Sequence, residues 1–132
     1  MRDSGDVFHL AIPVANLIEA EEFYVAGLGC KLARRYVDRI TMDFFGDQVV
    51  CHLSDRIDST PTLYPRHFGV TFRDQHDFDR VRTLVELRKL PIFQETQRRF
   101  EGMAEEHFTF VLRDPSNNLI EFKHYLDPRM MY

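Results

Sequence analysis

The sequence predicts an α+β fold of two tandem βαβββ modules, which form one cupped mixed sheet with the helices on its outer face. Two observations predict this fold. The order of strand-like and helix-like segments repeats once along the chain, and each half opens on a strand histidine, His9 or His67. A helix cap follows each histidine after seven residues, at Asn16 and Asp74. Half a sheet with one helix cannot bury both of its faces, so the two halves should pack together.

The first module is predicted at about residues 6–54. Strand-forming residues cover 7–14, and Asn16 then caps a helix whose apolar residues recur at helical spacing. Gly27 and Gly29 end this helix. Three strands complete the module, near residues 32–37, 40–45 and 48–53.

A polar, turn-rich linker at about residues 55–64 leads to a second module at about 65–126, so that residues 1–132 form a single domain. This module starts with a strand at 67–72, followed by a helix that Asp74 caps and Pro91 stops. A short strand at 92–93, an irregular charged segment around 98–106, and strands at 108–112 and 119–125 complete it.

Composition excludes several classes of protein. The chain has 132 residues, of which 44% are hydrophobic, and its net charge is −4, so it should fold rather than stay disordered. Basic residues are scattered and no run approaches the length of a membrane span, which predicts neither a nucleic-acid partner nor a membrane. A polar start without a signal peptide predicts a cytoplasmic protein, and Cys30 and Cys51 are expected to be reduced packing residues.

Four side chains are candidates for a metal site. Alternation along a strand places His9 and His67 on the face away from the helices, and the repeat makes His52 and Glu121 approximate counterparts on the fourth strands. Two imidazoles and one carboxylate suit a divalent transition metal, and such a set with open positions is usual for non-haem Fe(II). His52 could bind the metal, bind the substrate, or only pack.

Four further residues are candidates for substrate binding or proton transfer. Lys123 and Tyr125 share the predicted face of Glu121, where they could neutralise an oxyanion or donate a proton. Arg99 could bind a substrate carboxylate. His107 could act as an acid or base, although alternation does not settle which way it points.

Several segments of the chain resemble the vicinal oxygen chelate superfamily, which includes glyoxalase I, bleomycin resistance proteins and extradiol dioxygenases. The segments are residues 8–14, 22–24, 27–30, 67–70 and 114–122. This resemblance implies paired βαβββ modules whose cup holds a divalent metal, with His9, His67 and Glu121 at the ligand positions. It also implies a small-molecule substrate and a homodimer, in which a site is formed either within one chain or across two.

The set of two histidines and a glutamate looks most like the extradiol dioxygenase branch, which implies Fe2+ or Mn2+, with Ni2+ or Zn2+ as alternatives. The substrate would chelate the metal through adjacent oxygens. A glyoxalase-like lyase or isomerase is a second reading, although glyoxalase I has a carboxylate on the fourth strand where this sequence has Val50, Cys51 and His52. A bleomycin-resistance-like protein that binds a ligand without turnover is a third.

Overall fold

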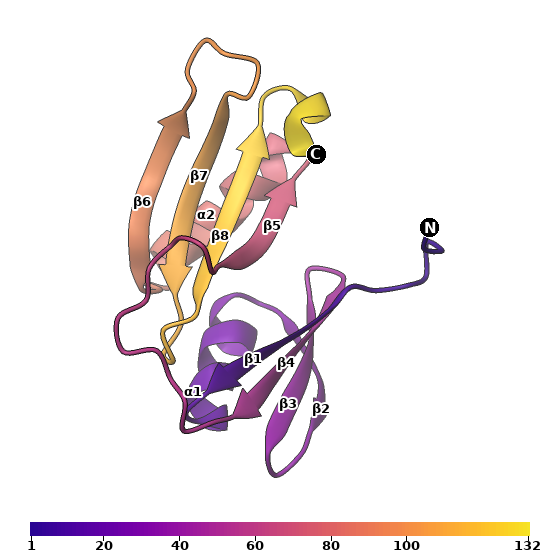
Figure 1. Cartoon of the computed structure of the whole chain (residues 1–132), viewed down its shortest axis with the longest axis vertical. Coiled ribbons are helices and arrows are strands. Elements are labelled where there is room, and N and C mark those ends of the chain that lie inside the picture. Colours follow the sequence, from indigo (N-terminus) through magenta and orange to yellow (C-terminus); the bar gives the residue numbers. More distant parts are fainter.

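The computed structural model describes residues 1–132 and contains the two predicted βαβββ modules (Figure 1). The first consists of β1 (His9–Val14), α1 (Leu17–Glu21), the π-helical turn η1 (Glu22–Gly27), β2 (Lys31–Arg35), β3 (Arg39–Phe44) and β4 (Asp47–Leu53). The second consists of β5 (Phe68–Phe72), α2 (Gln75–Leu87), β6 (Ile92–Arg99), β7 (His107–Arg113) and β8 (Leu119–Tyr125), followed by the 3₁₀ turn η2 (Pro128–Met131). The predicted fold class is confirmed.

Each module has its own four-stranded mixed sheet, in the orders β1-β4-β3-β2 and β5-β8-β7-β6. In each, the first strand runs parallel to the fourth and the other neighbours are antiparallel. The single cupped sheet that the sequence predicts is therefore wrong for one chain, because no strand of the first sheet pairs with a strand of the second. A cavity of about 820 Å³ lies beside residues 10–13 of β1 and beside His67 and Phe68 at the start of β5.

Both predicted helix caps are present. The Asn16 side chain accepts hydrogen bonds from the backbone N–H groups of Ile18 and Glu19, and Asp74 accepts one from that of His76. The segment between β5 and β7 differs from the prediction. The strand expected at 92–93 runs to Arg99, because its backbone pairs with β7 across two register shifts that the side-chain pattern does not reveal.

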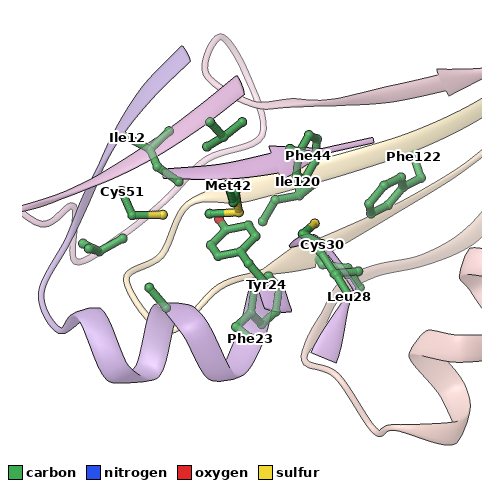
Figure 2. Close-up of a cluster of buried hydrophobic side chains, with 14 of the residues drawn as sticks. Ile12, Phe23, Tyr24, Leu28, Cys30, Met42, Phe44, Cys51, Ile120 and Phe122 are labelled. Atoms are coloured by element: carbon green, nitrogen blue, oxygen red, sulfur yellow. The ribbon is translucent and has the colours of Figure 1, made fainter. Parts of the chain in front are cut away.

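The two modules share one hydrophobic core, because the helix-side faces of both sheets contribute to it. Eighteen buried residues form the cluster, and Figure 2 shows Met42 and Phe44 of β3 near Ile120 and Phe122 of β8. The Phe44 ring also lies 5.6 Å from that of Phe68, measured between centroids. The polar faces of the sheets are the opposite faces, and they point away from this core.

A buried hydrogen-bond cluster connects the turn between β7 and β8 to the first module. The Tyr24 hydroxyl donates to Asp114 over 2.7 Å, and the Asn118 amide donates to the carbonyl oxygen of Pro13 over 2.9 Å. The backbone N–H groups of Ser116 and Asn118 also donate to Asp114. Burial raises the pKa of the Asp114 carboxyl.

Cys30 and Cys51 are buried and form no disulfide bond, as expected. None of the helices has both the length and the apolar character that a membrane span requires.

Candidate functional site

His67 and Glu121 meet on the polar face of the second sheet. His67 directly precedes β5, and the parallel pairing of β5 with β8 sets Gly69 opposite Glu121. The Nε2 atom of His67 therefore lies 2.9 Å from Oε2 of Glu121. Glu121 is only 6% exposed, so few water molecules can reach its carboxylate.

The contact of the other ring nitrogen of His67 determines which nitrogen of a neutral imidazole carries the hydrogen. Its Nδ1 atom lies 2.7 Å from the carbonyl oxygen of Leu63. A carbonyl oxygen can only accept, so Nδ1 carries the hydrogen, and a neutral imidazole then presents the Nε2 lone pair to the carboxylate. Two electron-pair donors this close need a proton or a cation between them. Histidines that bind metals commonly donate their other N–H to a carbonyl or carboxylate in this way.

Two further groups contact Glu121. The hydroxyl of Thr109, on β7, donates to Oε1 over 2.6 Å, and Thr109 is fully buried. The Nζ atom of Lys123 lies 3.5 Å from Oε2. One carboxylate oxygen is thus oriented by a hydroxyl, while the other faces the imidazole and the ammonium group.

Gly69 allows β5 to approach Glu121 closely. A Cβ atom built on Gly69 would lie 1.7 Å from the backbone oxygen of Glu121, far inside van der Waals contact. Only glycine therefore fits this position while β5 and β8 keep their spacing.

His107, Tyr125 and Arg99 extend the same polar face. Strand register pairs His107 with both Tyr125 and Arg99, so the three share the face of Glu121. This answers which way His107 points. Its Nδ1 atom lies 2.8 Å from the carbonyl oxygen of Glu105, which leaves Nε2 as the proton-accepting atom of a neutral ring. The ring centroid lies 4.6 Å from that of Tyr125, and Arg99 donates to the Tyr64 hydroxyl over 3.2 Å.

His9 and His52 lie on the other module, apart from this centre. They share the polar face of the first sheet, where register pairs His9 with Gln48 and His52 with Pro13, and both are exposed. His9 Nδ1 lies 2.5 Å from Oε1 of Gln48, so its Nε2 is also left with a lone pair. Nowhere in the chain do three His, Cys, Asp or Glu side chains gather closely enough to hold a metal ion. The structure brings two of the three predicted ligands together, and His9 is not with them.

The family model of the Glyoxalase/Bleomycin resistance protein/Dioxygenase superfamily matches residues 6–122, which covers both modules. The chain belongs to this superfamily. No curated protein matches it.

Three solved structures are similar to the chain. The chain is similar to a glyoxalase/bleomycin resistance protein/dioxygenase from Alicyclobacillus acidocaldarius, with 64% identity, complete coverage of both chains and a TM-score of 0.96. It is also similar to a lactoylglutathione lyase from Agrobacterium tumefaciens, with 14% identity, coverage of 93% and 96%, and a TM-score of 0.69. A fosfomycin resistance protein from Listeria monocytogenes has 13% identity, coverage of 94% and 97%, and a TM-score of 0.72. The last two likenesses show the fold alone.

In this member of the glyoxalase/bleomycin resistance/dioxygenase superfamily, Thr109 and Gly69 also belong to the candidate site, and neither was predicted from the sequence. A signal for Thr109 existed, because alternation along residues 107–113 places it on the same face as His107. No comparable signal existed for Gly69. The close approach of β5 to the backbone of Glu121 depends on strand spacing, which residue types do not specify.

Proposed function

We propose that this superfamily member is a metal-dependent enzyme whose ion is bound by His67 and Glu121 of one copy and by His9 of a second copy. One observation carries the proposal. The Nε2 atom of His67 lies 2.9 Å from a buried carboxylate oxygen of Glu121, while Nδ1 contacts the Leu63 carbonyl oxygen. A divalent cation between these two donors would satisfy both and would complete an arrangement that metal-binding histidines share.

The proposal needs a second copy because His9, the third proposed ligand, lies away from His67 and Glu121 in the same chain. His9 is exposed on the polar face of the first sheet, and Gln48 holds its Nδ1 and leaves Nε2 available. The two polar faces lie opposite the shared core and so do not face each other within one chain. In a homodimer with isologous contacts, the first module of one copy can meet the second module of its partner twice, which would form two identical sites. His52 shares the His9 face and would line the same site.

The proposed reaction is of the extradiol dioxygenase type, on a small substrate that chelates the ion through adjacent oxygens. The ion, Fe2+ or Mn2+ in preference to Ni2+ or Zn2+, would supply Lewis acidity and leave positions for substrate and O₂. His107 Nε2 is the base for a substrate hydroxyl, and Tyr125, whose ring packs on His107, is the hydroxyl that returns a proton. Arg99 and Lys123 supply positive charge to the substrate oxygens.

Metal analysis and oxygen uptake test this function. We expect purified protein loaded with Fe2+ to hold one ion per chain and to consume O₂ with catechols. His67→Ala and Glu121→Ala should each lose the ion, because each leaves too few donors. Metal binding without oxygen consumption would contradict the dioxygenase and favour either the lyase or isomerase or the protein that binds a ligand without turnover. Stoichiometric metal that persists in both variants, or that never binds to the wild type, would contradict the proposed site.

A further inference from the structure

Lys123 lies beside the carboxylate oxygen that His67 contacts. Its Nζ atom is 3.5 Å from Oε2 of Glu121, and the side chains are 28% and 6% exposed, so water screens the pair only in part. A cation bound at Oε2 would lie next to this ammonium group. Since like charges repel at such distances, Lys123 and a metal ion compete for the same oxygen.

Lys123 has no second carboxylate among its strand neighbours. Strand register places Thr71 on one side and Thr109 on the other, and both are uncharged. Along β8 the next residue on the same face is Tyr125. When Glu121 binds a cation, the ammonium group of Lys123 therefore loses its counter-charge while it stays beside the site.

We propose that Lys123 competes with the metal for Glu121 and, once displaced, binds a negatively charged oxygen of the chelating substrate. This inference rests on the proposed function and names the substrate class as an anionic chelator, of which a carboxylate with an adjacent oxygen is the simplest. Metal and anion then bind cooperatively, because the first ligand frees the group that holds the second.

The test compares wild-type protein with Lys123→Met by calorimetric titration, first with Mn2+ alone and then with oxalate on the Mn2+-loaded protein. We expect the variant to bind Mn2+ about threefold to tenfold more tightly, because the competing ion pair is gone. It should bind oxalate about tenfold more weakly, because a charge-assisted contact is lost. Lys123→Arg keeps the charge and should stay near wild type in both titrations. Lys89→Met, in the exposed turn that follows α2, is the control for loss of a distant charge.

The variant should bind Mn2+ more tightly and oxalate more weakly, and these opposite changes identify the role of Lys123. Loss of a residue that only supports the fold would weaken the binding of both ligands. Equal Mn2+ affinity in wild type and Lys123→Met, or a loss of both affinities, would overturn the role of Lys123 and leave the proposed function intact. A wild-type protein that does not bind Mn2+ would overturn both. If Lys123→Met does not fold, Lys123→Gln removes the same charge and is judged by the same criteria.

Discussion

At the scale of single residues, neighbouring groups set the orientation of Glu121. Thr109 holds Oε1, His67 faces Oε2, and the Leu63 carbonyl fixes the hydrogen of His67 on Nδ1. Each contact restricts one atom of a candidate ligand. Such supporting hydrogen bonds raise metal affinity because the ligands are already in place when the ion arrives.

Thr109→Val tests this support, because it keeps the shape of the side chain and removes the hydroxyl that donates to Glu121. We expect a loss of about 1–3 kcal/mol in the free energy of unfolding, since a buried carboxylate oxygen loses its donor. Mn2+ affinity should fall about tenfold to a hundredfold. Urea denaturation and metal titration measure the two effects. Thr109→Ser retains the hydroxyl and is the matched control, so an equal loss in both variants would contradict the assigned role.

At the scale of elements, the parallel pairing of β5 with β8 creates the centre. The pairing brings residues 67 and 121, which are far apart in the chain, within contact distance, and it works only while Gly69 lies directly against the backbone of Glu121. A one-residue slip of β8 would turn Glu121 toward the core, and a one-residue slip of β5 would turn His67 away from Glu121. The register of this pair therefore determines the site as much as the ligands do.

Gly69→Ala should separate the strands, because its Cβ atom would overlap the backbone oxygen of Glu121. We expect destabilisation of about 3 kcal/mol in chemical denaturation, together with loss of Mn2+ binding. Gly5→Ala lies in the exposed N-terminal segment and should leave both properties unchanged. Wild-type metal affinity in Gly69→Ala would show that the close approach does not position Glu121.

At this scale, sequence patterns predicted some features of the helices and strands and not others. They predicted both caps, the two modules and the face of Lys123 and Tyr125, because caps and alternation follow from local backbone geometry. They did not predict the full length of β6 or the orientation of His107. Both depend on register with a neighbouring strand, which includes two shifts in the pairing of β6 with β7.

At the scale of the whole molecule, the turn between β7 and β8 connects the modules through Asp114. Burial raises the pKa of this carboxyl, so its charged form is disfavoured in the folded protein. A folded-state pKa above the unfolded value contributes stability that is fully present below the unfolded pKa and is lost as pH rises through the folded one.

Asp114→Asn removes this titration and keeps the size of the side chain. We expect the free energy of unfolding of wild type to exceed that of the variant by the most below the ordinary aspartate pKa of 3.8. This excess should shrink as pH rises through the raised pKa of Asp114. The free energy of unfolding of both proteins, measured across acidic to neutral pH, gives this difference. A difference that stays constant with pH would show that the carboxyl titrates normally.

Whether two copies share each metal site can be tested by mixing two variants that each lack one proposed ligand. His9→Ala and Glu121→Ala should each fail to bind Mn2+ stoichiometrically, since each lacks one ligand. After unfolding and joint refolding, mixed dimers should recover one of their two sites, because the first variant supplies His67 and Glu121 while the second supplies His9. Each variant refolded alone is the control. No recovery in a mixture that forms dimers would place the third ligand elsewhere.

The sequence by itself determined the two-module α+β fold and the chemical types in the site, because strand alternation, helix caps and an internal repeat are local properties of the chain. Tertiary structure decided which of these side chains meet. His67 and Glu121 come together with Thr109 and Lys123, while His9 lies on another face. The physical reason is that contact between distant residues depends on strand register and on which faces share the core, and both arise from packing of the whole chain.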